Sequence, residues 1–244
     1  MLQKTFCHVK GISTDFEKKL WDRGIENWDL FIVRISELED ISKNKLDKIK
    51  NEIELSRKAL AENNLQYFKE ALPAKEHWRL SNLGKIGFVD IETTGLNKWS
   101  DQMTVLGIYD GVNAEIYVQG KDLQKAKDRL KEFDIVVTFN GKQFDIPFIE
   151  HHFSIKYNFI HLDLRYMLKE LGYQGGLKLI EKEIGIRRDS NIQSIDGFEA
   201  VSLWYQYKRG NQKALHTLIE YNKQDVVSLK TLLEYYLENK KMKF

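Results

Sequence analysis

The sequence is poor in cysteine and in long apolar runs, and each shortage excludes a class of protein. Cys7 is the only cysteine, so no intramolecular disulfide can form, and no cysteine and histidine cluster has the spacing of a zinc site. No apolar run reaches the roughly 18 residues of a membrane span, and the amino terminus lacks the basic and then apolar layout of a signal peptide. We therefore expect a cytoplasmic protein without a membrane partner.

Net charge is also small. The 244 residues carry a formal charge of +2 and give a pI of about 8.4, which is too mild to indicate a polyanionic partner. Hydrophobic residues make up 42% of the chain and charged residues 30%, as in ordinary globular proteins with a sizeable core. Any nucleic-acid affinity must therefore come from a local basic surface.

What the sequence does contain is an apolar run that ends on two acids. Residues 86–95 read IGFVDIETTG. Side chains alternate between the faces of a β-strand, so Asp90 and Glu92 point to the same side. Two like charges this close raise the pKa of one of them unless a cation, usually a divalent metal, neutralises both. The alternative is a strand that ends in solvent with two surface acids, which an isolated Asp-x-Glu would favour.

Two further motifs change that balance. The apolar residues 135–139 lead into Asn140 and then Asp145, so a third acid follows a second strand. Tyr221 and Asp225 are four residues apart in a segment with helical apolar spacing, and they share one face of that helix. Each motif alone is weak, but three of them in matching structural contexts form a strong signal.

The order Asp-x-Glu, Asn-x-x-x-Phe-Asp, Tyr-x-x-x-Asp resembles the three exonuclease motifs of the DEDDy 3′-to-5′ exonuclease superfamily. The resemblance covers approximately residues 80 to 240. It is strongest to the stand-alone prokaryotic ribonuclease H-like exonucleases. It implies an α/β protein with a ribonuclease H-like, mixed five-stranded sheet flanked by helices. The implied activity is a divalent-metal-dependent 3′-to-5′ exonuclease that releases nucleoside 5′-monophosphates from single-stranded ends.

The resemblance also implies roles for the acids, with two Mg²⁺ or Mn²⁺ ions as cofactors. Asp90 would bridge both ions, Glu92 and Asp225 would serve the ion that activates water, and Asp145 would support the second ion through water. Four carboxylates without histidine suit these hard cations better than zinc. Tyr221 would orient the attacking water, because a phenol with a pKa near 10 is a poor base at neutral pH.

Substrate contacts are predicted around these acids. Thr93 and Thr94 are expected to meet the terminal nucleotide, through backbone amides that bind the 3′-hydroxyl. Asn140 would fix the loop of the second motif, and Trp99 is a candidate platform for a base, with a buried anchor as its other interpretation. Asp163 lies close by but is not predicted to bind metal. The expected partner is a single-stranded 3′ end, with DNA favoured over RNA; protein partners are not predicted.

The chain divides into a helical part at 1–75 and the α/β domain at 80–244. Residues 9–12 (VKGI) resemble half of a helix-hairpin-helix, for which both a packing role and phosphate binding stay open. Thr14 and Glu17 predict a capping box at the start of the next helix. Strands are predicted at 85–92, 102–109, 115–119, 135–139 and 159–162.

Two other functions remain open. The chain could be a nucleic-acid-binding or scaffold protein in which the acids hold a structural ion. It could also be an endonuclease like ribonuclease H or a junction resolvase, although those relatives lack the helical Tyr-x-x-x-Asp.

Overall fold

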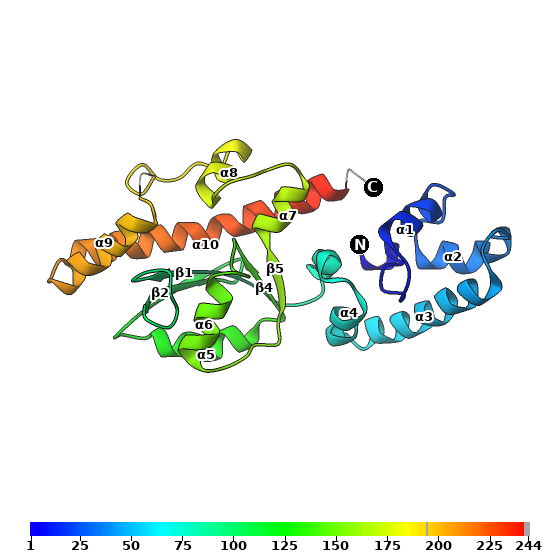
Figure 1. The fold of residues 1–244 in the computed structure, drawn as a ribbon, viewed down its shortest axis with the longest axis horizontal. Helices are drawn as coiled ribbons and strands as arrows, with labels where there is room; N and C mark the ends of the chain where they lie inside the picture. Colours follow the sequence, from blue (N-terminus) through cyan, green and yellow to red (C-terminus); the bar gives the residue numbers. More distant parts are fainter. Residues whose placement is uncertain (194, 242–244) are drawn as a thin grey trace. The chain divides into compact units, whose positions relative to one another are not determined.

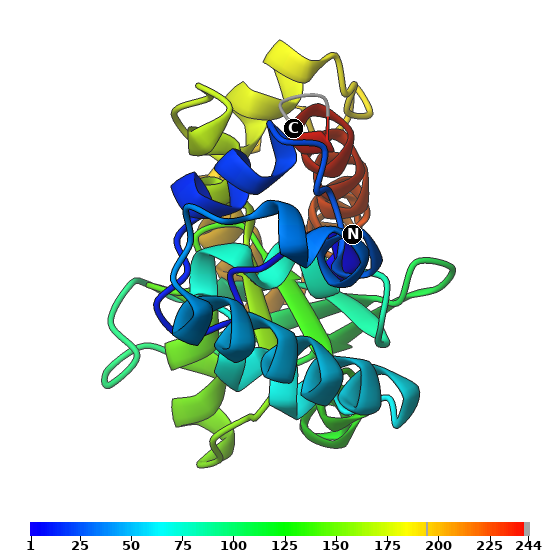
Figure 2. The ribbon, with the colours of Figure 1, turned by 90° about the vertical axis from the view of Figure 1, so that its right-hand side faces the viewer.

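The computed structural model describes residues 1–193 and 195–241, and the chain forms two compact units, Met1–Gly84 and Lys85–Phe244 (Figure 1). The helices of the first unit are blue and cyan in Figures 1 and 2. Over the described residues, no helix combines the length and apolar character that crossing a membrane requires.

The amino-terminal unit is built from helices without a strand. Its elements are η1 (Leu2–Lys4), α1 (Thr14–Trp21), α2 (Trp28–Arg34), η2 (Ile35–Glu37), α3 (Lys43–Ala61), α4 (Leu65–Ala71) and η3 (Ala74–Leu80). The longest, α3, buries Ile49 and Ile53, four residues apart on one stripe, and exposes most of its charged residues. Phe6, Trp28 and Phe68 are likewise buried in this unit.

The first helix begins differently from the capping box predicted at Thr14. The residue that caps α1 is Ser13, whose Oγ accepts a hydrogen bond from the N–H of Phe16 at 3.3 Å. The carboxylate of Glu17 is buried and forms an ion pair with Arg79 at 2.6 Å instead of reaching back to the helix start. The prediction was wrong because a buried guanidinium is a stronger partner than a solvated amide.

The second unit contains a mixed sheet of five strands among the residues that the structure describes. They are β1 (Ile86–Thr93), β2 (Met103–Tyr109), β3 (Ala114–Val118), β4 (Ile135–Thr138) and β5 (Ile160–Asp163). Their order is β3-β2-β1-β4-β5; β1 pairs antiparallel with β2 and β2 with β3, whereas β4 runs parallel to both β1 and β5. The prediction of a mixed sheet is confirmed, and β1 lies at its centre.

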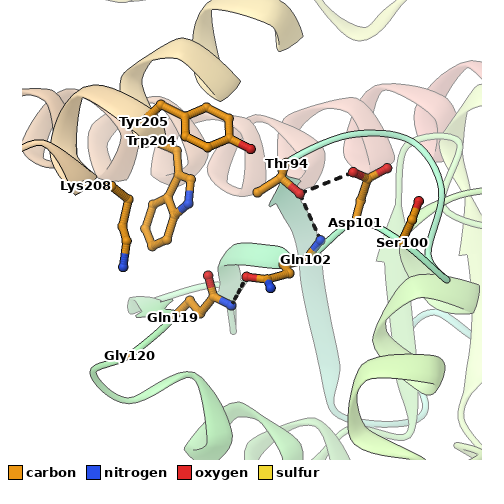
Figure 3. A pocket seen from close by; sticks show the side chains of 9 residues that line it. All are labelled: Thr94, Ser100, Asp101, Gln102, Gln119, Gly120, Trp204, Tyr205 and Lys208. Carbon is orange, nitrogen blue, oxygen red and sulfur yellow. Dashed lines mark hydrogen bonds between the residues drawn. The ribbon is translucent and has the colours of Figure 1, made fainter.

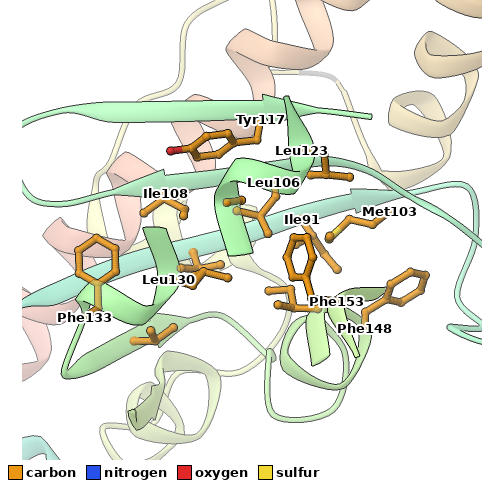
Figure 4. Packing of buried hydrophobic residues seen from close by; sticks show 14 residues of the cluster. Ile91, Met103, Leu106, Ile108, Tyr117, Leu123, Leu130, Phe133, Phe148 and Phe153 are labelled. Carbon is orange, nitrogen blue, oxygen red and sulfur yellow. The ribbon is translucent and has the colours of Figure 1, made fainter. Parts of the chain in front are cut away.

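Helices cover both faces of the sheet (Figure 1). One face packs against α5 (Ala126–Arg129), its flanking turns η4 (Leu123–Lys125) and η5 (Leu130–Glu132), and α6 (Asp145–Phe153) (Figure 4). The other face packs against α9 (Gly197–Lys208) and α10 (Gln212–Lys241). The remaining helices are α7 (Leu164–Glu170) and α8 (Leu177–Ile184). Val89 and Ile91 of β1 belong to the first core, so Asp90 and Glu92 face α10.

Candidate active site

Strand β1 and helix α10 bring three of the predicted acids together. Asp90 and Glu92 alternate with the buried Val89 and Ile91 on β1, and Asp225 projects from α10. One carboxylate oxygen from each of the three acids lies within 4.8 Å of the others. Oxygen donors this close together, with no nitrogen or sulfur among them, suit Mg²⁺ or Mn²⁺.

The fourth acid stands beside this group. Asp145 is the first residue of α6 and is only 3% exposed. Its Oδ1 accepts a hydrogen bond from the backbone N–H of Ile91 at 3.2 Å, so it rests against β1 between the two acids of that strand. The structure therefore places Asp145 next to β1 without making it part of the group of three.

Burial and mutual repulsion make these carboxyls weak acids. Removal from water, followed by the charges of the neighbouring carboxylates, raises the pKa of Asp90 and of Glu92 well above the ordinary range. Burial likewise raises the pKa of Asp145 to about 7 and that of Asp225 to about 6. A bound divalent cation would reverse this effect by favouring the ionised forms.

Tyr221 lies one helical turn before Asp225 and is 7% exposed. Burial and the nearby acids raise the pKa of its phenol, which stays neutral at physiological pH. The ammonium of Lys178 lies 4.8 Å from the centre of the Tyr221 ring, and the guanidinium carbon of Arg188 lies 5.8 Å from it. The ring is thereby held between cationic side chains and the acid group, with its hydroxyl as a neutral donor.

A cavity of about 550 Å³ opens onto the acids. Its polar wall contains the predicted residues Asp90, Glu92, Thr93, Thr94, Asn140, Asp145, Tyr221 and Asp225. Its apolar wall includes Leu96, Phe144, Phe198 and Val201, of which Phe198 is 90% exposed. The cavity thus combines a charged floor with side chains on which a flat ring can stack.

Thr93 and Thr94, which are predicted to contact the substrate, form hydrogen bonds within the chain. The N–H of Thr94 donates to the carbonyl of Gln102 at 2.9 Å, so this amide is engaged at the end of the sheet. Binding of a 3′-hydroxyl by backbone amides at Thr93 and Thr94 stays a prediction. Thr93 donates its hydroxyl to the carbonyl of Gly95 at 2.5 Å. Substrate binding by Thr93 or by the Thr94 side chain stays a prediction.

Asn140 has a left-handed backbone, with φ at 65°, in the loop after β4. Its N–H and that of Lys142 donate to Asp163, at 2.8 and 2.9 Å, and its Oδ1 accepts from Arg165 at 2.7 Å. Asp163 therefore fixes this loop through backbone amides.

Trp99 does not line the cavity. Its side chain is 75% exposed, which excludes the interpretation of a buried anchor, and its ring packs edge-on against His151 with 4.4 Å between centroids. Its role as a platform for a base stays a prediction.

Comparison with known proteins identifies the family of this chain. Residues 87–237 match the family model of the RNase H superfamily, which is more than half of the chain. The chain belongs to the RNase H superfamily. The matched residues include all four acids and Tyr221, and the predicted fold is confirmed.

Two solved structures are similar to this RNase H superfamily chain at low identity. The family B DNA polymerase of Pyrobaculum calidifontis matches with 18% identity and a TM-score of 0.54 over 63% of this chain and 24% of the polymerase. NrnC of Brucella melitensis matches with 22% identity and a TM-score of 0.47 over 70% of this chain and 80% of NrnC. The chain thus spans about a quarter of the polymerase's length. No curated protein matches.

Sequence reasoning missed Asn222, which supports the site of this RNase H superfamily chain. Asn222 is fully buried on α10, and its Nδ2 donates to Oδ2 of Asp90 at 2.9 Å. A Cβ at Gly107 of β2 would lie 2.2 Å from its Oδ1, so only glycine lets the helix approach the sheet here. The signals in the sequence were a glycine inside a strand and a polar residue next to Tyr221.

A second supporting residue, Arg188, lies outside the three sequence motifs. Its Nη2 lies 2.5 Å from Asp225 and donates to Glu181 of α8 at 2.9 Å, while its Nε donates to Glu181 at 2.5 Å. Both Arg188 and Glu181 side chains are almost fully buried. Arg188 is thus the countercharge that holds Asp225 in place.

Proposed function

We propose that this chain is a divalent-metal-dependent 3′-to-5′ exonuclease of the DEDDy type, which removes nucleoside 5′-monophosphates from single-stranded ends. The observation that carries the proposal is the group formed by Asp90, Glu92 and Asp225, whose ligand oxygens lie within 4.8 Å of one another on the floor of a cavity. Asp145 and Tyr221 line the same cavity, which supports the full set of five residues.

The residues present fit a divalent cation. The buried carboxyls repel one another and have raised pKa values, and the only donors in the group are oxygens. We propose two Mg²⁺ or Mn²⁺ ions held by Asp90, Glu92, Asp145 and Asp225. When bound, such a pair of ions activates water and stabilises the leaving oxygen of an in-line phosphoryl displacement.

The chain's own side chains would position the reactants. Tyr221 keeps its proton, so its hydroxyl can hold the attacking water in line with the scissile phosphate by a hydrogen bond. Asn222 holds the carboxylate of Asp90 and Arg188 that of Asp225, so both acids stay aimed at the cavity. Leu96 and Phe198 supply the exposed apolar surface on which the terminal base can stack.

The substrate we propose is the 3′ end of single-stranded DNA, favoured over RNA. No described side chain of the cavity is recognisable as a reader of the 2′-hydroxyl. The preference for DNA rests on the hairpin-like segment at residues 9–12 and on the resemblance of the three motifs to those of the proofreading domains of family B DNA polymerases. A cytoplasmic location likewise stays a prediction.

The decisive experiment is digestion of a 5′-labelled single-stranded DNA oligonucleotide, with its RNA counterpart in parallel, in Mg²⁺ or Mn²⁺. We expect a ladder that shortens from the 3′ end, absent with EDTA and with Asp90→Ala. The ratio of the two rates gives the preference between DNA and RNA.

Other outcomes would replace the proposal. Internal cuts would indicate an endonuclease. Intact DNA and RNA with both metals, together with metal-stabilised binding of the strand, would indicate a binding or scaffold protein.

A further inference from the structure

A second cavity has a volume of about 630 Å³, and Figure 3 shows the side chains that line it. It is lined by Thr94, Ser100, Asp101, Gln102, Gln119, Gly120, Trp204, Tyr205 and Lys208. Thr94 lines both cavities. Helix α9 also lines both, with Phe198 and Val201 in the first and Tyr205 and Lys208 in the second. Steps of three and four residues keep these side chains on one face of the helix, so α9 and Thr94 join the cavities into one groove.

One wall of the second cavity is held by hydrogen bonds. The N–H of Gln102 donates to Oγ1 of Thr94 at 2.9 Å, and the N–H of Thr94 donates to the carbonyl of Gln102 at 2.9 Å. The Nε2 of Gln119 donates to Oε1 of Gln102 at 2.8 Å (Figure 3). This bond uses one donor and one acceptor of the two amides, so the pair still offers the donors of Gln102 and the carbonyl of Gln119 to a ligand.

The opposite wall provides an aromatic face and a positive charge. Tyr205 is 47% exposed, and its neighbour on α9, Trp204, is buried. The ammonium of Lys208 lies 5.8 Å from the centre of the Trp204 ring, which holds it at the cavity. Asp101 lies beside Gln102 in the chain and also lines the cavity, and its carboxylate accepts a hydrogen bond from the N–H of Asn97 at 2.9 Å. An anion is therefore favoured beside Lys208 and repelled beside Asp101.

These features fit a nucleobase attached to a phosphate. A ring that stacks on Tyr205 would present its polar edge to the amides of Gln102 and Gln119, and its phosphate would lie toward Lys208. We propose that the second cavity binds the penultimate nucleotide of the strand. This assignment rests on the proposed function: the first cavity takes the terminal nucleotide, and at a 3′ end that nucleotide has a single neighbour.

Binding of abasic oligonucleotides tests the assignment. Short 5′-fluorescein-labelled DNA strands, intact or with one abasic site at the terminal, penultimate or third nucleotide, are titrated in Ca²⁺ and followed by anisotropy. We expect the penultimate abasic site to weaken binding to the parent about tenfold, as loss of one stacked base does. With Tyr205→Ala the same abasic site should change affinity by less than about twofold, because the stacking partner is already absent.

Matched controls separate this effect from general damage. Gln206→Ala changes an exposed residue of the same helix outside the cavity, and it should respond to each abasic site as the parent does. Lys208→Gln should weaken binding of every strand, whereas Lys213→Gln, at an exposed lysine outside the cavity, should not. Gln102→Ala gives a second test of the cavity if Tyr205→Ala does not fold.

The outcomes distinguish this proposal from the proposed function. Coupling between Tyr205 and the terminal or third position, or no coupling at all, overturns the penultimate assignment. The p-nitrophenyl ester of thymidine 5′-monophosphate has no penultimate nucleoside, so its hydrolysis by the parent tests the chemistry of the first cavity separately from the strand. A parent that cleaves neither this ester nor oligonucleotides disproves the exonuclease activity, while the binding experiment still decides what the second cavity holds.

Discussion

Each unit buries a cluster of charged side chains, but the two clusters are balanced differently. In the amino-terminal unit, Arg79 lies between Glu17 and Glu76, at 2.6 and 2.8 Å, and all three side chains are almost fully buried. The second oxygen of Glu17 also accepts hydrogen bonds from the hydroxyl of Thr5 at 2.5 Å and the N–H of Phe6 at 2.6 Å. Every charge in this cluster has a partner in the same unit.

The cluster of the second unit has an excess of acid. Arg188 is shared between Asp225 and Glu181. Asp90 accepts a hydrogen bond from Asn222, which is neutral. Over the described residues, neither Asp90 nor Glu92 forms an ion pair with a cationic side chain. Buried charges without partners reduce stability, so their presence indicates a functional requirement. The comparison teaches that balanced buried charge serves the fold, and unbalanced buried charge marks the site.

Replacing one acid of the site should have the largest effect. Asp90→Asn removes a ligand and one of the repelling charges. We expect turnover to fall by more than about 10²-fold, because loss of a residue that only supports a metal ligand already lowers activity by about 10- to 100-fold. In EDTA the same variant should melt at a higher temperature than the parent, since it relieves repulsion at a functional site. Activity assays and calorimetry measure the two effects. A variant that is less stable in EDTA would contradict the account of an unbalanced cluster.

The opposite is expected in the amino-terminal unit. Glu17→Gln leaves the buried Arg79 with one carboxylate, and breaking such a pair costs about 3–5 kcal/mol of unfolding free energy. Glu26→Gln is the control, because Glu26 pairs with Lys4 at 3.5 Å while both are largely exposed, and such pairs contribute at most about 1 kcal/mol. Denaturant unfolding measures both changes. Equal stability of the two variants would show that the buried cluster does not stabilise this unit.

Tyr221→Phe should have a smaller effect on the second cluster. The carboxylates are unchanged, so we expect affinity for Mg²⁺ to be retained while turnover falls about 10- to 100-fold, as for a lost supporting hydrogen bond. Tyr236→Phe is the control on the same helix, because its hydroxyl donates to Glu170 at 3.1 Å. Single-turnover rates and calorimetric titration with Mg²⁺ check this. Loss of metal binding in Tyr221→Phe would mean that the hydroxyl supports the ligands and not the water.

Periodicity and short spacings were enough to predict the strands and the face of its element on which each acid lies. The alternation of Val89 and Ile91 with Asp90 and Glu92 places the two acids on one face of a strand, and a four-residue offset places Tyr221 and Asp225 on one face of a helix. These are local rules of backbone geometry. They locate side chains on an element, and the family's order of motifs then brings the elements together.

Partners that are far apart in the sequence could not be predicted in this way. Arg188 lies in the loop between α8 and α9 and forms ion pairs with Glu181 and Asp225. The sequence of this loop has no hydrophobic periodicity from which these contacts could be predicted. The capping prediction at Thr14 failed for the same reason, because the partner of Glu17 lies 62 residues away at Arg79. Burial decides which of several possible partners a charged side chain takes, and burial depends on the whole fold.

The pH dependence of stability gives a further test of the two clusters. Asp145 and Asp225 have pKa values of about 7 and 6 in the folded chain, above the ordinary value of 3.8. Between pH 4 and 7, approximately, the folded state therefore binds more protons than the unfolded state, and the unfolding free energy falls with rising pH by up to about 1.4 kcal/mol per pH unit for each proton. Buried His8 and His161, with pKa values lowered to about 4 from 6.5, give the opposite slope.

Comparison of the parent with Asp145→Asn isolates the contribution of Asp145, because the histidines and the other acids are the same in both. In EDTA, the parent should lose stability relative to the variant as the pH rises from 5 to 7, and the difference should stay constant above about pH 8, where the carboxyl is ionised in both states. Mg²⁺ binds the ionised carboxylates, so its stabilisation of the parent should grow over the same interval. Melting temperatures at fixed pH values provide the measurement. A difference that does not change between pH 5 and 7 would mean that Asp145 is already ionised without a cation, and that Arg188 and the backbone balance the site as fully as Arg79 balances the amino-terminal cluster.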